Sequence, residues 1–187
     1  MRPMSQEEKT AELVAWLVAR RLFQELMSAE ADRRWTLARQ AGFGSLELAD
    51  LLVQESLRVQ SEEPGWSEEL AELALAVAER VEPGAAEGRA NDLKALALCL
   101  MANARRLRGD WPGAEEALGA VAVVLTAPPD SFERAFYCQT LAWLREAQGQ
   151  VHEAVALLWR AARVFRAVGA PEEQRACLGR LGALSGR

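Results

Sequence analysis

The feature that most constrains this chain is an internal repeat, because the sequence matches itself when it is shifted by about 40 residues. The clearest match pairs Gly109 with Gly149, and each of these glycines divides one long helical segment from another. Identical residues accompany this pair at seven more positions: Ala95, Ala102, Arg105, Ala114, Leu118, Ala122 and Val124 recur as Ala135, Ala142, Arg145, Ala154, Leu158, Ala162 and Val164. A pair of helices cannot bury its own apolar face, so this repeat predicts units that stack and complete one core together.

A partial third unit follows the two full ones. One further step of the same length brings Leu181 and Gly182 under Leu141 and Ala142. The small residues at 102, 142 and 182 are expected to let a neighbouring helix approach closely. Residues 45–82 are interpreted as a degenerate helix pair of the same kind.

Composition decides which elements fill the repeat. The 187 residues include 35 Ala, 27 Leu and 22 Glu, but no Ile and only one Tyr. Ala, Leu, Glu and Arg favour helices, whereas the β-branched and aromatic residues that favour strands are scarce. The sequence therefore predicts an all-α protein.

Glycine, proline and capping residues divide the chain into about nine helices joined by short connections. Ser28, Ser45 and Ser131 are expected N-caps, and Pro112 suits the first turn of a helix. Short connections favour antiparallel neighbours. The expected helices are 5–27, 29–41, 45–61, 66–81, 89–108, 112–125, 131–148, 151–168 and 171–184, with a loop over 83–88. We expect one domain, in which residues 1–44 form an N-terminal helical cap continuous with a repeat region over 45–187.

Two segments resemble tetratricopeptide repeats, namely LMANARRLRGDWPGAEEAL at 100–118 and LAWLREAQGQVHEAVALL at 141–158. The first carries Met101-Ala102, Gly109-Asp110-Trp111 and Ala114 at the motif positions, and the second carries Leu141-Ala142, Gly149, Ala154 and Ala161. Arg105 and Arg145 stand where the family usually has an aromatic residue, and the helices are longer than usual. The resemblance covers about 91–184 and implies an α-solenoid of antiparallel helix pairs.

The resemblance also implies a binding surface, because proteins of this family bind peptides on a concave face lined by the first helices. Register from the two glycines places the following residues on or near that face: Leu96, Cys99, Asn103, Arg106, Phe136, Gln139, Trp143, Glu146 and Arg180. Asn103 stands where some members hold a ligand backbone or carboxylate. Phe136 and Trp143 are interpreted either as apolar anchors for a ligand or as packing between units.

We therefore expect a non-catalytic module that binds a peptide or helix of a partner protein in its concave groove. The alternative is a regulatory or sensor subunit of a signalling, transcription or defence system. An enzyme is not expected, because no nucleophile with its base, HExxH, Walker A loop, GxGxxG or Cys-x-x-Cys is found. No cofactor or metal is expected, and His152 is interpreted as a solvated residue at a helix start.

The cysteines follow the repeat closely. Cys99, Cys138 and Cys177 lie 39 residues apart, on the first helices of successive units. One interpretation is a ladder of redox-active or metal-binding thiols. The other, which we favour, is that each cysteine is a small buried residue in a tight helix interface.

Charge is distributed unevenly along the chain, whose net charge is −5. Residues 61–88 carry eight Glu and one Arg, whereas residues 145–187 carry seven Arg and four Glu. Arg160, Arg163 and Arg166 fall on adjoining turns and form either a solvated face or a patch for an acidic partner. The acidic balance argues against nucleic-acid binding.

Neither a membrane span nor a signal peptide is expected. The apolar run from Leu13 to Ala19 is too short to cross a bilayer, and Glu7 and Glu8 stand where a signal peptide needs positive charge. We expect a cytoplasmic protein. The stripe Leu178, Leu181 and Leu184 on the final helix is expected either to face inward, as a cap, or to pair in a homodimer.

Overall fold

The computed structural model describes residues 5–82, 84 and 87–186, and these ranges are all-helical, with no strand. The all-α prediction is therefore confirmed for the described chain. Its elements are α1 (Gln6–Ser28), α2 (Ala31–Ala38), the short 3₁₀ helix η1 (Ala41–Phe43), α3 (Leu46–Val59), α4 (Pro64–Ala78), α5 (Glu87–Leu107), α6 (Trp111–Val124), α7 (Phe132–Ala147), α8 (Val151–Val168) and α9 (Pro171–Ser185).

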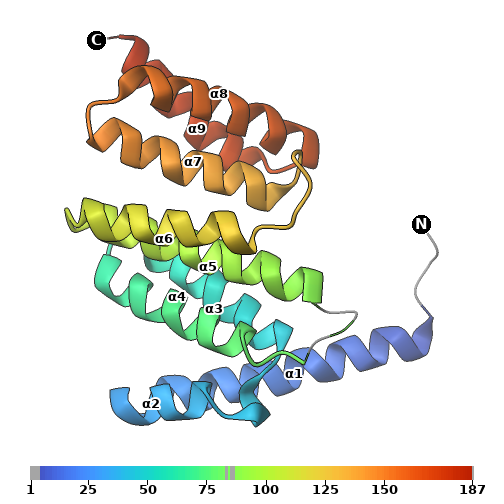
Figure 1. Ribbon diagram of the computed structural model, residues 1–187. Coiled ribbons are helices and arrows are strands. Elements are labelled where there is room, and N and C mark those ends of the chain that lie inside the picture. Colours follow the sequence, from blue (N-terminus) through green and yellow to red (C-terminus); the bar gives the residue numbers. More distant parts are fainter. Residues whose placement is uncertain (1–4, 83, 85–86, 187) are drawn as a thin grey trace.

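The helices are layered in chain order, from α1 and α2 at one end to α8 and α9 at the other (Figure 1). Each of α4, α6 and α8 packs against the helix that precedes it. The odd-numbered helices also contact one another, because α5 touches both α3 and α7. Helix α1 lies against α3, and its N-terminal half extends past the rest of the molecule (Figure 1).

Short polar side chains cap the N-terminus of several helices by accepting a hydrogen bond from a backbone amide that has no partner within the helix. The Oγ atoms of Ser45 and Ser131 accept from the third residue of the following helix, as expected. Ser28 was expected to cap the second helix, but it is the last residue of α1, where its Oγ donates to the carbonyl of Glu25. Helix α2 begins after Glu30 and is shorter than expected, because the chain turns into η1.

Other helix boundaries differ by a few residues from those expected from the sequence. Helix α4 begins at Pro64 and ends at Ala78, whereas 66–81 was expected. Proline suits this first turn, since its missing amide hydrogen would have no partner there. Helix α5 begins at Glu87, inside the expected 83–88 loop. Residues 83, 85 and 86 of that loop, residues 1–4 of the expected cap and residue 187 lie outside the described residues.

The two aligned glycines close the same kind of turn. Gly109 has φ of 82° and Gly149 has φ of 79°, a left-handed conformation that glycine adopts without steric cost. The amide after each glycine donates to the carbonyl five residues back, at 2.9 Å after Gly109 and 2.8 Å after Gly149. The two glycines that the sequence aligns therefore close turns of the same backbone geometry.

Small residues of the repeat lie in the core. Ala102, Ala114, Ala142 and Ala154 are all buried. Gly182 was expected to act in the same way but is exposed, because no other helix of the described chain covers that side of α9. On the same helix, Leu181 and Leu184 are buried, while Leu178 is 41% exposed.

Candidate functional site

Five of the residues that register places on or near the concave face meet in one cleft, near the C-terminal ends of α5 and α7. These are Asn103, Arg106, Trp143, Glu146 and Arg180, and the cleft has a volume of about 330 Å³. We call it the Arg106 cleft. Its remaining lining residues are Gln60, Ser61 and Leu107.

A chain of hydrogen bonds fixes the Arg106 side chain in this cleft. Its Nε and Nη2 donate to Asn103 Oδ1 at 3.0 and 2.8 Å, and Asn103 Nδ2 donates to Gln60 Oε1 at 2.6 Å. The guanidinium carbon lies 5.8 Å from the centroid of a Trp143 ring, within range of a cation–π contact. Asn103 is buried, so its amide orients the guanidinium from inside the helix packing.

The charge of Arg106 has no ion-pair partner among the described residues. The nearby carboxylate of Glu146 is already bound by Arg180, whose Nε lies 2.5 Å from Glu146 Oε2. Burial lowers the pKa of Arg106, and the charge of Arg180 acts in the same direction, while Glu146 acts against it. The cleft therefore holds a half-buried cation that is fixed in place and lacks its own counter-charge.

Such an arrangement suits recognition of a carboxylate. A guanidinium offers several donors in one plane, and Asn103 occupies one edge of it. A carboxylate entering the cleft would form charge-assisted hydrogen bonds with the donors that remain.

Three expected binding residues lie elsewhere. Phe136 is buried and stacks on Phe132 with ring centroids 6.0 Å apart. Gln139 is also buried, where its Nε2 donates to the Cys177 sulfur at 3.4 Å. Leu96 is partly buried against the core. None of them lines the Arg106 cleft, because Phe136 and Gln139 face the helix packing and Leu96 lies about two turns before Asn103 on α5.

The three cysteines are free thiols, and all are buried. Burial raises the pKa of Cys177 to about 11 and raises the pKa of Cys99 and Cys138 as well. Thiols with raised pKa values are poor nucleophiles at neutral pH. The prediction that the three cysteines are buried is therefore confirmed.

Few side chains in the described ranges could form a metal site or a catalytic site. There, no three His, Cys, Asp or Glu side chains are grouped so that they could hold a metal ion. His152 is exposed at the start of α8, as expected. None of the described helices combines the length and the apolar character that crossing a bilayer requires.

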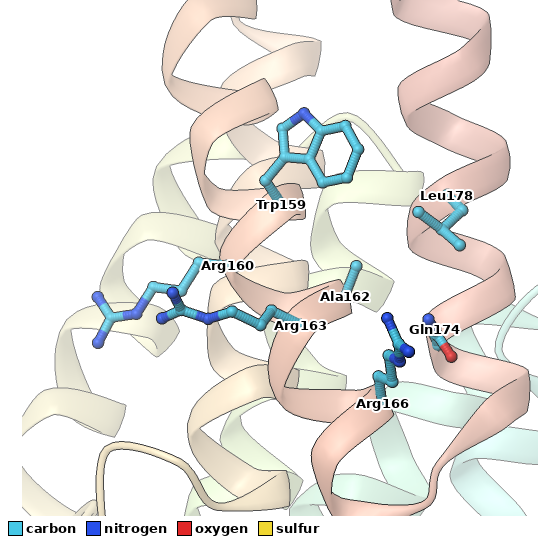
Figure 2. Close-up of a pocket in the computed structure, with 7 residues that line it drawn as sticks. All are labelled: Trp159, Arg160, Ala162, Arg163, Arg166, Gln174 and Leu178. Carbon is cyan, nitrogen blue, oxygen red and sulfur yellow. The ribbon is translucent and has the colours of Figure 1, made fainter.

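A wider groove runs between α8 and α9, with a volume of about 710 Å³ (Figure 2). We call it the α8–α9 groove. Figure 2 shows Trp159 and Leu178 on its two sides, with Ala162 between them and Arg166 beside Gln174. Arg160 and Arg163 also line the groove, and their side chains extend from α8 away from α9 (Figure 2). The arginines are exposed and form no ion pair with any described residue.

Comparison with protein-family models, with curated proteins and with solved structures found no match.

The residues that the sequence did not indicate are Gln60, Ser61 and Leu107 in the cleft and Trp159 and Gln174 in the groove, whereas Leu178 was expected only as part of the stripe on the final helix. Gln60 caps α3 and is brought to α5 by tertiary packing, so no local pattern identifies it. For Trp159, the sequence did contain an indication that the side chain is exposed. This residue follows Leu158, which faces the core, and therefore falls outside the apolar stripe of 151–168.

Proposed function

We propose that this chain is a non-catalytic interaction module that binds an acidic peptide segment of another protein in the Arg106 cleft. We further propose that its helices form an α-solenoid of tetratricopeptide-like antiparallel pairs. A cytoplasmic location suits the three unpaired cysteines, since free thiols persist in reducing compartments.

The solenoid proposal rests on the repeat and on the contacts between helices. Gly109 and Gly149 close the same turn in successive units. The odd-numbered helices contact each other, as the first helices of stacked pairs would. All four helices that supply the cleft are odd-numbered, namely α3 through its C-cap Gln60, α5, α7 and α9.

The observation that carries the binding proposal is the half-buried Arg106, which lacks a carboxylate. A charge that is partly removed from water loses hydration, and an opposite charge in the same place restores favourable interactions. Arg160, Arg163 and Arg166 also lack carboxylates, but they are exposed and keep their hydration. The need for an outside carboxylate is therefore greater at Arg106 than at these three arginines.

The size of the cleft limits what can enter. A volume of about 330 Å³ is at the lower end of the range for ligand pockets. It accommodates one or two side chains but not a packed helix. We therefore expect an extended segment that places an Asp or Glu side chain on Arg106 and adjacent atoms on the face of Trp143.

Selection from a random peptide library displayed on phage tests this proposal, with the full chain as bait. Selected peptides are then synthesised with a fluorophore, and their binding is measured by anisotropy. Arg106→Gln and Trp143→Ala are compared with Arg89→Gln, which removes an exposed arginine outside the cleft. Circular dichroism confirms that each variant keeps its helical content.

The expected result is enrichment of peptides with Asp or Glu that lose at least tenfold in affinity with Arg106→Gln and Trp143→Ala. Their affinity should be unchanged with Arg89→Gln. A selection without enrichment, or acidic peptides that bind Arg106→Gln as tightly as the unmodified chain, would overturn the proposal. Loss of binding with Trp159→Ala or Arg163→Gln alone would move the site to the α8–α9 groove.

A further inference from the structure

Helix α1 carries apolar side chains on two opposite faces. One face packs against α2 and α3 and includes the fully buried Ala19 and Leu26. The other is open to solvent: Leu13, Val14, Leu17 and Val18 are 60, 52, 57 and 51% exposed. Four large apolar side chains on one face are more than a solvated surface requires.

The exposed apolar side chains centre on one line along the helix. Val14 and Leu17 are neighbouring positions of this line, whose steps alternate between three and four residues as in paired helices. Polar residues continue the line at both ends, with Glu7 and Thr10 on one side and Arg21 on the other. Leu13 and Val18 flank this line. At 100° per residue, it lies on the side of α1 opposite Ala19 and Leu26, so a second helix could lie there without meeting the rest of the molecule.

The N-terminal half of α1 also lacks support within the described chain. Every residue from 5 to 14 is exposed, and this half extends past the other helices (Figure 1). A few helical turns without tertiary contacts are marginally stable in water. Pairing along the exposed face would supply the missing contacts.

The charges at the two ends of this line select the orientation. Glu7 stands at one end and Arg21 at the other, and both are exposed. A parallel pair of these helices would oppose Glu7 to Glu7 and Arg21 to Arg21. An antiparallel pair brings Glu7 of each copy within one turn of Arg21 of the other, with Val14 and Leu17 at the centre.

We propose that α1 forms the interface of a homodimer, in which this exposed face packs antiparallel against the same face of a second copy. Two apolar faces meet at the twofold axis, and two Glu7–Arg21 ion pairs close the ends. The same surface is used by both copies, so the assembly stops at two. Glu7, Glu8 and Glu12 in the free half disfavour an anionic membrane as the occupant.

Sedimentation equilibrium of the full chain, from about 5 to about 500 µM, tests the proposal. The expected result is a monomer–dimer equilibrium whose dissociation constant rises at least tenfold with Leu17→Glu. Glu7→Arg and Arg21→Glu should each weaken the dimer as well, since like charges then face each other. The double variant Glu7→Arg/Arg21→Glu should restore it. Leu178→Glu, on α9, is the matched control and should change nothing.

A chain that stays monomeric throughout this range would overturn the proposal. So would a dimer that survives Leu17→Glu and is broken by Leu178→Glu, which would place the interface on the C-terminal helix. Binding of the monomer to vesicles of phosphatidylcholine and phosphatidylserine, lost with Leu17→Glu, would instead assign the face to a membrane. Arg106→Gln should leave the dimer intact, so failure here is distinct from failure of the peptide site.

Discussion

Arg105 of α5 reaches Glu68, the fifth residue of α4, with Nε 2.7 Å from Glu68 Oε1. One repeat later, Arg145 of α7 reaches Glu115, the fifth residue of α6, with Nη1 2.9 Å from Glu115 Oε1. In both cases, an arginine on an odd-numbered helix binds the start of the preceding even-numbered helix. This shared contact gives a physical reason for arginine at both positions.

The Arg105–Glu68 pair should contribute measurably to stability. Both side chains are mostly buried, at 21 and 13% exposure, so water screens the pair less than it screens a surface pair. A double-mutant cycle with Arg105→Ala and Glu68→Gln, measured by urea unfolding, should give a coupling energy of about 1 kcal/mol. The control is Arg58–Glu55, an exposed pair within α3, for which we expect no resolvable coupling. Equal coupling in the two pairs would contradict this assignment.

Ser56 and Ser67 join α3 to α4 through reciprocal hydrogen bonds inside the core. Ser56 Oγ donates to the Ser67 carbonyl at 2.8 Å, and Ser67 Oγ donates to the Ser56 carbonyl at 3.0 Å. Ser67→Ala should lower the free energy of unfolding by about 1 kcal/mol, because it removes one of these bonds. Ser56→Ala with Ser67→Ala should lower it by less than the sum of the single changes, since the two Oγ atoms also lie 2.9 Å apart and each single change already removes that shared contact. Additive losses in urea unfolding would show that the two bonds act independently.

Gly149→Ala and Gly119→Ala should change stability in opposite directions. Gly149 has φ of 79°, where an alanine is strained even though no atom stands in its way, so thermal and urea unfolding should show a loss of about 1 kcal/mol. Gly119 lies within α6 with open space around it, and alanine there should add about 0.5–1 kcal/mol. A gain at Gly149 would mean that the turn is not left-handed in solution.

Asp92→Asn should stabilise the chain at neutral pH. The Oδ1 atom of Asp92 is buried without a hydrogen-bond partner, and burial, followed by the charge of Glu133, raises the pKa of this carboxyl. Because the pKa of Asp92 is higher in the folded chain than in the unfolded chain, ionisation of this carboxyl destabilises the fold at pH values above the folded pKa. This destabilisation disappears as the pH falls below the unfolded pKa of about 4. We expect a gain of about 0.5 kcal/mol at pH 7, since the residue is partly open to solvent.

Urea unfolding of this variant between pH 3.5 and 7 checks the sign, because its advantage over the unmodified chain should shrink in acid. Asp130→Asn, at an exposed position, is the matched control and should have no effect at any pH. An advantage that grows as the pH falls would contradict the raised pKa.

Local sequence signals were sufficient to predict the helices. Gly109 and Gly149 need a conformation that few other residues adopt, and Ser45 and Ser131 satisfy backbone amides, so both kinds of residue mark helix ends reliably. Ser28 misled the prediction because a serine late in a helix can bond backward to a carbonyl instead of capping the next helix.

The candidate site was only half predictable. Helical register gives the first helices on which Asn103, Arg106 and Trp143 lie, and these residues do meet in the cleft. Register does not say how each helix is rotated against its neighbours, which is why Phe136 and Gln139 lie inside. The sequence shows the run from Leu13 to Ala19 only as too short for a membrane span, because an apolar run does not reveal which of its sides the fold covers.

The even spacing of the cysteines places one buried thiol in each of α5, α7 and α9. A buried sulfur can be modified only while its surroundings open, so each thiol reports the opening of its own helix. The modification rates of these three thiols therefore show whether α5, α7 and α9 open together or separately. Equal modification rates would show that the three helices open as one unit, whereas a gradient from Cys177 to Cys99 would show the molecule opening from its C-terminal helix inward.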